Sequence, residues 1–550
     1  MVNAIMFGCG LAVFIAITLF LGWYGYKNTK NKDNFLIGKN KSNPILIGLA
    51  YGATFLSTSA IVGFGGMASR YGMGMIWLVF LNLFVGLIIA FIVFGKRTRK
   101  LNVKLGALTF ADFLGKRFKS PLIRIITAVI VLVGMPIYCA AVLIGGVNFL
   151  LPLDIGITKN IAILVISAVV LLYVTYGGII AVMYNDALQA AIMFVGMFAI
   201  LIVTYLVLGD LTTGGVHESL TDLWGSGGKG NFYTPPVAPA MEGMQGWTMF
   251  PEMGSNAWIY MVSTILMGVG IGALAQPQLA ARFMTAKDSK TLNKSLVIGS
   301  IFMIVIVGTA YTVGALTNLY FVKEFGMNSA DYIFSLNGAV NIDLVIPTFV
   351  TTIFGSMGTG GEAFVIIFIL GILCASISTI GALLHTMGAA AGHDLWSEAE
   401  RKRKKKIVTK PSLTVTRAAT VVMMIVVIIL AYLMPTNIIA KATSIFMGLT
   451  AAALLPAYTN AVFAKSPNAL AAKMSMLIGS VVWLVWALFI NASIGGMLGT
   501  QIVTTGQIVF IDPLILALPI SAAVMILTCL IKPSKGDPAA DIPDAEPSGE

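Results

Sequence analysis

Hydroxyl side chains at helical spacing inside an apolar stretch are the first residues in this chain that indicate chemistry. In GILCASISTIG, Ala375, Ser378 and Thr379 stand at positions i, i+3 and i+4, which places them on one face of a helix. A hydroxyl there either donates to the carbonyl of the preceding turn, which is the structural alternative, or offers its lone pair to a hard cation. Because neutral oxygens suffice to hold a singly charged ion such as Na⁺, the pattern favours a monovalent-cation site.

A second apolar stretch, residues 45–68, supplies the carbonyl oxygens that such a site needs. It is long enough to cross a bilayer, but Gly, Ser and Thr crowd its centre. A helix broken at that depth survives only where protein, water or an ion satisfies the freed backbone groups. The stretch therefore predicts a discontinuous helix beside a binding site, with a glycine-lined packing surface as the alternative.

Residues 256–277 repeat this pattern, with Gly268, Gly270 and Gly272 inside the span and Pro277 at its end. Paired discontinuous helices at corresponding positions of two halves are typical of transporters with inverted repeats and a site near the middle of the membrane. The second stretch is the fifth span after the first, so we predict residues 45–208 as the first repeat and residues 256–463 as an oppositely oriented second repeat.

The composition requires an integral membrane protein, because 58% of the residues are hydrophobic and only 11% are charged. We predict an all-α integral membrane fold with about thirteen transmembrane helices. The expected spans are residues 4–24, 45–68, 74–95, 122–150, 160–178, 187–208, 256–277, 296–320, 363–389, 413–434, 437–463, 470–491 and 511–531.

The net charge of +12 is concentrated in alternate connections between the spans, which argues for membrane topology and against nucleic-acid binding. Basic loops lie in the cytoplasm, so we predict the N-terminus outside and the C-terminus in the cytoplasm. The run 401–406 is read in the same way, with a nuclear-localisation or lipid-headgroup patch as the alternative. The remaining divisions are an extra first helix and cytoplasmic loop (1–44), an external connection (209–255), two last helices (464–531) and a disordered tail (532–550).

Four ordered motifs give the chain a resemblance to the sodium:solute symporter family. They are GVGIGALAQPQLAARFMTAKDS (268–289), IYCAA (137–141), YGGIIAVMYNDALQAAIM (176–193) and GILCASIST (371–379). The first is similar to a segment of the family's proline symporters. The resemblance, over roughly residues 5–535, implies a leucine-transporter-type (LeuT-like) 5+5 inverted repeat with an extra N-terminal helix.

The resemblance also implies roles for individual residues. The family's sodium site falls on the carbonyls of Ala53, Leu56 and Ala375 and on the hydroxyls of Ser378 and Thr379.

Two further residues match family positions outside that ligand set. Asp186 corresponds to an acidic residue on the sodium exit path, and its alternative is a helix N-cap or first-turn carboxylate. Tyr138 corresponds to a substrate-gate tyrosine, and its alternative is an interfacial aromatic.

The expected solute site departs from that of the proline symporters. Phe55 replaces an Asp of those proteins, and Val269 and Ala273 replace a Trp and a Tyr. The segment ATFLSTSAIVG (53–63) is more similar to that of monocarboxylate cotransporters. Asn82 is a further candidate, with an interhelical hydrogen bond as the alternative. The substrate-binding candidates are therefore Thr54, Phe55, Ser57, Tyr138, Val269, Ala273 and Asn82.

We interpret the chain as a sodium-coupled symporter, not an enzyme, that imports a small monocarboxylate or amino-acid-like solute across the plasma membrane by alternating access. Its expected partners are the solute, the co-transported sodium ion and the lipid bilayer, with no nucleic acid or obligate protein partner. The alternatives are proton coupling, another solute such as proline, pantothenate or a sugar, and a nutrient sensor with a transporter fold.

Overall fold

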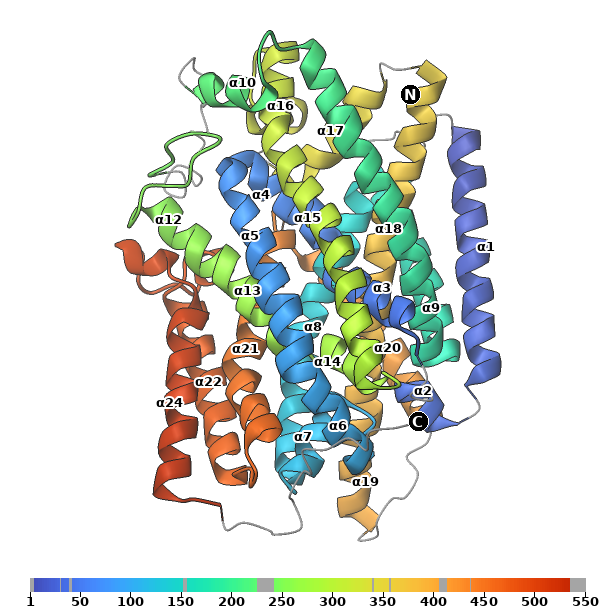
Figure 1. Ribbon diagram of the computed structural model, residues 1–550, viewed down its shortest axis with the longest axis vertical. Coiled ribbons are helices and arrows are strands. Elements are labelled where there is room, and N and C mark those ends of the chain that lie inside the picture. Colours follow the sequence, from blue (N-terminus) through green and yellow to red (C-terminus); the bar gives the residue numbers. More distant parts are fainter. Residues whose placement is uncertain are drawn as a thin grey trace.

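The computed structural model describes residues 4–29, 31–38, 42–151, 156–224, 242–338, 341–355, 358–404, 413–435 and 437–534. Within these ranges the chain forms helices and no strands (Figure 1). Eleven of the described helices are long and apolar enough to cross a membrane. The all-helical membrane class predicted from the composition is therefore confirmed.

The eleven long helices contain the thirteen predicted spans. Helix α9 (Lys159–Asp210) is two helices joined at a kink, because Gly178 has φ 59° and ψ −153°. The long helical stretch Ser59–Leu105 turns at Gly72, whose φ is 66°. Each of these two long stretches is therefore two spans that meet at a glycine. The segment Ser59–Tyr71 forms one span together with the short helix α3 (Pro44–Phe55), and the spans then follow one another in the predicted order.

The helix bounds follow the chain in order. The first half contains α1 (Ala4–Asn28), α2 (Lys32–Ile37), α3, η1 (Ser59–Gly63), α4 (Phe64–Tyr71), η2 (Gly72–Met75), α5 (Ile76–Leu81), η3 (Asn82–Gly95), α6 (Lys96–Leu105), α7 (Phe110–Arg117), α8 (Pro121–Asn148), α9 and α10 (Val216–Leu223). The second half contains α12 (Asn256–Tyr260), η6 (Met261–Met267), α13 (Gly268–Gly272), η7 (Ala273–Ala275), α14 (Pro277–Met284), α15 (Ser289–Phe325), α16 (Ser329–Asn337), η8 (Ile342–Leu344), α17 (Val345–Gly355), α18 (Gly358–Ala389), η9 (Ala390–Leu395), α19 (Trp396–Lys404), α20 (Leu413–Leu433), α21 (Ile439–Phe463), α22 (Ala469–Phe489), α23 (Gly495–Leu498), η10 (Gln507–Phe510) and α24 (Pro513–Ile531).

Helices α1 and α24 lie at opposite edges of the molecule, and the broken helices lie between them (Figure 1). Helix α1 begins near one end of the molecule, and α24 ends near the other. Helix α1 packs on α9, and α24 packs on α21 and α22. The core that positions the site is therefore formed by α3, α8, α9, α13, α15, α18 and α21.

The first predicted break is present at the centre of the stretch 45–68. Helix α3 starts with Pro44 at its first turn and ends at Phe55, and Leu56 has the non-helical angles φ −93° and ψ 79°. The chain becomes helical again near Ser59, in the π-helical segment η1. The change of backbone angles at Leu56 interrupts the helical hydrogen-bond ladder and frees carbonyls of the last turn of α3 for other partners.

The second break lies at Gln276 and not at the glycines, so the prediction of a Gly-interrupted helix at 268–272 is wrong in its position. Residues Gly268–Gly272 are helical, whereas Gln276 is extended, with φ −76° and ψ 117°. Pro277 explains the position, because a proline lacks the N–H of the ladder and restricts the residue before it to extended angles. The Gln276 amide donates to the carbonyl of Gly272 at 2.9 Å and to Thr450 Oγ1 at 2.6 Å.

Part of the external connection 209–255 covers the turn between α4 and α5. Trp247 is fully buried, and its carbonyl accepts the N–H of Met73 at 2.7 Å. The Trp224 and Trp247 rings meet edge to face at 5.1 Å. The described part of this connection therefore contacts the end of α4, the second half of the first broken helix. Residues 225–241 and the tail beyond residue 534 fall outside the described ranges.

Candidate sodium and solute site

Four of the five predicted sodium ligands meet where α18 packs against the end of α3. Ser378 Oγ lies 3.1 Å from the carbonyl oxygen of Ala53 and 3.3 Å from that of Ala375. Thr379 Oγ1 lies 3.2 Å from the same Ala53 oxygen. Oxygens that bind one cation at about 2.4 Å and at right angles lie about 3.4 Å apart. The four oxygens thus have the spacing of a partial coordination shell.

The fifth predicted ligand, the Leu56 carbonyl, forms no hydrogen bond with the Ser378 or Thr379 hydroxyl among the described residues. Leu56 is the C-cap of α3, and its N–H donates to the carbonyl of Gly52 at 2.7 Å. Because the non-helical ψ of Leu56 turns its carbonyl away from the helical ladder, that oxygen is free to take another partner.

Asp186 and Arg282 form a fully buried ion pair beside these ligands. Arg282 Nη2 lies 2.7 Å from Asp186 Oδ2 and donates to Thr54 Oγ1 at 3.0 Å. Thr54 Oγ1 also donates to Asp186 Oδ2 at 3.2 Å. The three side chains join α3, α9 and α14. Asp186 lies well inside the helix that follows Gly178, so the alternative of an N-cap is wrong.

The ion pair does not satisfy all its polar atoms. Asp186 Oδ1 and Arg282 Nε have no hydrogen-bond partner among the described residues. A buried pair repays the loss of hydration only when its remaining atoms are also bonded, so this arrangement favours a functional role. Arg282 lies within the motif 268–289, and a cationic side chain in an apolar stretch is the sequence signal that points to it.

Gln189 is a further buried polar residue that sequence reasoning missed. Helices α9 and α18 pack side by side. A Cβ at Gly371 would stand 3.6 Å from the Cα of Met193, and a Cβ at Gly196 would stand 3.5 Å from the Cα of Phe368. This antiparallel register places Gln189 at the level of Ala375. Both amide atoms of Gln189 lack a hydrogen-bond partner within the described ranges. The amide is therefore a polar group next to the predicted sodium ligands.

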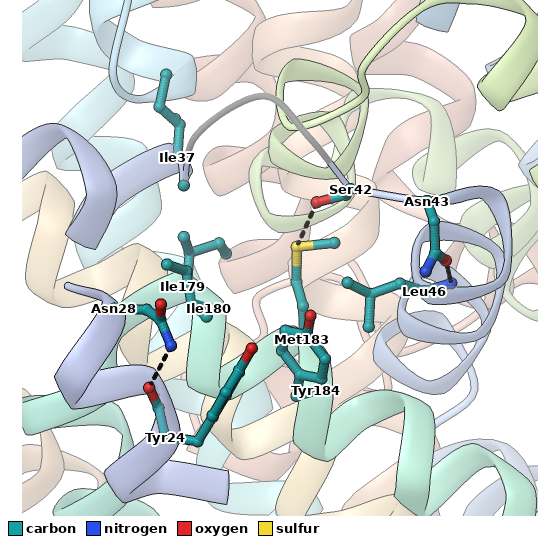
Figure 2. Close-up of a pocket in the computed structure, with 11 residues that line it drawn as sticks. Tyr24, Asn28, Ile37, Ser42, Asn43, Leu46, Ile179, Ile180, Met183 and Tyr184 are labelled. Atoms are coloured by element: carbon teal, nitrogen blue, oxygen red, sulfur yellow. Dashed lines mark hydrogen bonds between the residues drawn. The ribbon is translucent and has the colours of Figure 1, made fainter.

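A pocket opens one helical turn from Asp186 (Figure 2). It has a volume of about 180 Å³ and lies between the end of α1, the start of α3 and the part of α9 that follows Gly178. The Tyr24 and Tyr184 rings meet edge to face at 5.3 Å, and the Ser42 hydroxyl points at the sulfur of Met183 at 3.8 Å. The pocket thus has both polar and apolar lining side chains and lies one helical turn from the buried Asp186.

Tyr138 lies at the break of the first helix. Its hydroxyl donates to Ser57 Oγ at 3.0 Å, and its ring stacks on Phe446 at 5.6 Å. Ser57 Oγ also accepts the N–H of Ser59 at 3.1 Å. Because Tyr138 is only 1% exposed, the alternative of an interfacial aromatic is wrong.

Phe55 and Ala273 lie on either side of Gly86. A Cβ atom at Gly86 would stand 3.0 Å from the Phe55 ring and 3.3 Å from the Cβ of Ala273. Val269 is buried one turn before Ala273, and Asn82 is buried one turn before Gly86. The Asn82 side chain faces Tyr311, but its Oδ1 has no hydrogen-bond partner in the described part of the chain. The structure therefore places Phe55 against the face that Val269 and Ala273 leave small.

A cluster of charges ties η9 and α19, which continue α18, to the start of α8. Arg124 Nε lies 2.8 Å from Asp394, and Arg124 Nη1 lies 3.3 Å from Glu398 and 3.7 Å from Asp112. Burial raises the pKa of the Asp112 carboxyl, but the His393 ring, with Nε2 3.8 Å from Asp112 Oδ2, and the charges of Arg124 and Lys116 outweigh it and hold that pKa well below its usual value. Arg124 is therefore a clamp between scaffold helices and not a solute ligand.

The chain is similar to known proteins over most of its length. The sequence pattern described as "Sodium:solute symporter family" matches residues 35–479. The osmoregulated proline transporter OpuE of Bacillus subtilis is 24% identical over 481 residues, which are 86% of this chain and 87% of that protein. The sodium/proline symporter of Escherichia coli is 26% identical over 395 residues, which are 71% and 70% of the two chains.

A solved structure also shares the fold. The substrate-bound, outward-open structure of a Na⁺-coupled sialic acid symporter aligns with a TM-score of 0.70 and 17% identity, over 96% of this chain and 98% of that one. The likeness confirms the predicted leucine-transporter-type fold. The limits of the two repeats within that fold stay predictions.

Proposed function

Because the chain belongs to the sodium:solute symporter family, it is a sodium-coupled solute symporter, and we propose that its sodium ion binds where α3 breaks against α18. The observation that carries this proposal is the meeting of the Ser378 and Thr379 hydroxyls with the Ala53 carbonyl. Hydroxyl hydrogens rotate freely, so both side chains can turn their lone pairs to an ion. The Leu56 and Ala375 carbonyls complete the proposed ligand set.

Sodium at this position would couple two elements. The ion would hold the broken helix against α18 and thereby fix the backbone around Ser57, where the solute is proposed to bind. One Na⁺ that moves through about 100 mV releases about 2.3 kcal/mol, and a tenfold gradient adds about 1.4 kcal/mol. The sum, about 3.7 kcal/mol, supports accumulation of several hundredfold.

The Arg282–Asp186 pair is the proposed inner gate of the sodium path. It stands between the predicted ligands and the pocket beside Met183 and Tyr184, and it joins elements of both predicted repeats. Release of sodium to that pocket would require the pair to separate or the ion to pass along Asp186 Oδ1. We place this end in the cytoplasm of a plasma-membrane protein, with the N-terminus outside, because the basic connections lie there.

We propose a small organic carboxylate or amino-acid-like solute. Ser57, Tyr138 and the unpartnered Asn82 oxygen offer hydrogen bonds, and Phe55 narrows the space beside Ala273. Arg282 is already paired with Asp186, so a carboxylate would be held by hydroxyls, by backbone N–H groups and by the sodium ion itself. Proline is the second candidate, because the Bacillus subtilis and Escherichia coli relatives are proline transporters by name.

Uptake into proteoliposomes tests both parts of the proposal. Radiolabelled acetate, pyruvate, lactate and proline are offered separately, with an inward Na⁺ gradient, with choline in its place, and with a proton gradient alone. Concentrative uptake of a carboxylate only with Na⁺ is the expected result. Concentrative uptake of proline, without competition by the monocarboxylates, would replace the carboxylate proposal with the second candidate. Uptake driven equally by protons would contradict the sodium site.

A further inference from the structure

Asp512 is a buried carboxylate outside the sodium site. It is only 5% exposed, and its Oδ1 accepts the N–H of Leu514 at 2.8 Å as the N-cap of α24. Its own N–H donates to Ser263 Oγ at 3.1 Å. No basic side chain of the described residues forms an ion pair with it. A charge buried among membrane helices without a partner is costly, and such residues are functional by default.

Oxygen atoms of the second broken helix surround the free side of this carboxylate. A Cβ at Gly268 would stand 3.8 Å from Asp512 Oδ2 and 3.6 Å from the carbonyl oxygen of Ser263. Thr264 is 6% exposed and faces Asp512, and its Oγ1 has no hydrogen-bond partner among the described residues. Ser263 and Thr264 belong to the π-helical segment η6, a distortion that is frequent at functional sites.

Helices α21 and α22 close the other sides. The Cβ of Ser444 lies 3.9 Å from the Gly268 Cβ position, and its hydroxyl donates to the carbonyl of Ala440 at 3.2 Å, which leaves the oxygen lone pairs for another partner. A Cβ at Gly448 would stand 3.5 Å from Asp512 Oδ1 and 3.1 Å from Trp483 Nε1. Trp483 is 3% exposed, and its Nε1 also lacks a partner in the described ranges. An unpartnered hydroxyl, which can offer a lone pair, and an unpartnered indole N–H, which can only donate, therefore adjoin a carboxylate that forms no ion pair with the described residues.

Helix capping alone does not explain an acid at this position. Asn468 caps the neighbouring helix α22 through the N–H groups of Leu470 and Ala471 without any charge. The cap on α24 uses Asp512 Oδ1 and leaves Oδ2 directed at Gly268. A neutral cap would also satisfy the N–H groups, and the helix dipole adds only about 0.3–1 kcal/mol in favour of the acid, less than the cost of burying an unpaired charge. The negative charge thus calls for a positive ligand.

We propose that Asp512 is the anionic ligand of a second sodium site, completed by the Thr264 hydroxyl, the Ser263 carbonyl and the Ser444 hydroxyl. The site lies between η6, α13, α21 and α24. It deepens the proposed function and rests on it, because a second ion adds to the driving force only in a sodium-coupled symporter. Its occupancy would tie α24, which lies outside both predicted repeats, to the second broken helix.

Equilibrium binding of radioactive sodium to the purified full-length protein tests the site directly. Asp512→Asn keeps the helix cap and removes the charge, and Thr264→Val removes a second ligand with little change of shape. Ser521→Ala is the matched control, because Ser521 bonds to Ser475 between α22 and α24 away from Asp512. The double variant Ser378→Ala/Thr379→Ala removes the first site.

We expect the wild-type chain to bind two sodium ions. Asp512→Asn should bind one ion, and so should the Ser378→Ala/Thr379→Ala variant. Thr264→Val should weaken the binding of one of the two ions about tenfold, and Ser521→Ala should still bind both ions. The number of sodium ions taken up per solute molecule should fall from two to one in Asp512→Asn.

Two bound ions in a folded Asp512→Asn protein would overturn the inference. So would an Asp512→Asn protein that keeps its sodium binding and loses only the pH dependence of uptake, since the carboxylate would then bind a proton. If the wild type binds no sodium, the proposed function itself fails.

Discussion

The Arg282 guanidinium lies 2.7 Å from the Asp186 carboxylate, and both side chains are fully buried. The pair joins α9 of the first predicted repeat to α14 of the second, and Thr54 of the broken helix α3 bonds to both members. In the proposed mechanism, the path that releases sodium is therefore closed by a charge pair whose Oδ1 and Nε atoms have no hydrogen-bond partner among the described residues.

Breaking this pair should weaken both the fold and the coupling. Asp186→Asn leaves a buried guanidinium unpaired, which costs about 3–5 kcal/mol. We expect a lower melting temperature and sodium leakage from loaded vesicles without solute. Asp186→Asn/Arg282→Gln should recover much of the stability but not the tight coupling. A double variant that transports and couples like the wild type would show that the pair is structural only.

Removal of two hydroxyls should abolish sodium dependence. Ser378→Ala/Thr379→Ala deletes two of the five proposed ligands, so uptake should no longer respond to Na⁺ while the protein stays folded and inserted. Ser376→Ala is the control, because Ser376 lies on the same helix but donates to the carbonyl of Val142 at 3.0 Å. Initial uptake rates over a range of Na⁺ concentrations give the answer. An unchanged sodium response in the double variant contradicts the site.

Phe55→Ala should weaken transport of the native solute and admit larger analogues. Loss of a packed aromatic costs about 3–5 kcal/mol in a rigid core, and less where solute or water can enter. Gly86→Ala tests the same contact from the other helix, because the added Cβ would stand 3.0 Å from the Phe55 ring. We expect Gly86→Ala to impair uptake in the wild type and to be tolerated in Phe55→Ala. Competition by solutes of graded size measures both effects, and an unchanged size profile would place Phe55 outside the pocket.

The orientation in the membrane is open to a direct test. Reporter fusions after Lys406 and after Lys535 should report the cytoplasm, and a fusion within residues 225–245 should report the outside. The reason is the concentration of basic residues in alternate connections. An external signal at Lys406 would invert the proposed inner gate and the direction of import.

The clamp between α7, α8 and α18 should lose stability in acid. The pKa of Asp112 is lower in the folded protein than in the unfolded chain, so its contribution to the unfolding free energy is present above about pH 4 and is lost as the pH falls through the folded value. Asp112→Asn should remove about 1.5–3 kcal/mol at pH 7 and flatten the fall in melting temperature below pH 4. Parallel pH curves for the variant and the wild type would contradict this assignment.

Sequence patterns predicted the spans and the first break because both depend on local properties. Apolar runs of fixed length define the spans, and the group of Gly, Ser and Thr around Leu56 coincides with the observed break. The second break was misplaced because glycines in α13 serve close packing: a Cβ at Gly272 would stand 2.6 Å from the Cβ of Met447. Proline sets the break instead.

The polar partners could not be predicted, since they depend on contacts between distant segments. Arg282 and Gln189 stand in motifs that were already recognised, yet neither has a neighbour in sequence that reveals its partner or lack of one. Asp512 reads as an ordinary helix cap from its sequence, and only the packing of α13 and α21 around it shows the unpaired charge. Such residues become visible only when helices are assembled.

The two breaks differ in how their freed backbone groups are satisfied. At Gln276 the residue's own side-chain amide donates to the carbonyl of Gly272. This side-chain bond replaces the backbone hydrogen bond that is missing at the second break. At Leu56 the corresponding oxygens are left to mobile hydroxyls and, in our proposal, to an exchangeable ion. The fold therefore combines one break that the protein's own side chain satisfies with another break whose oxygens, in our proposal, bind an exchangeable ion. In our proposal, sodium availability therefore controls the stiffness of the break at Leu56, whereas the Gln276–Gly272 hydrogen bond spans the second break whether or not an ion is bound.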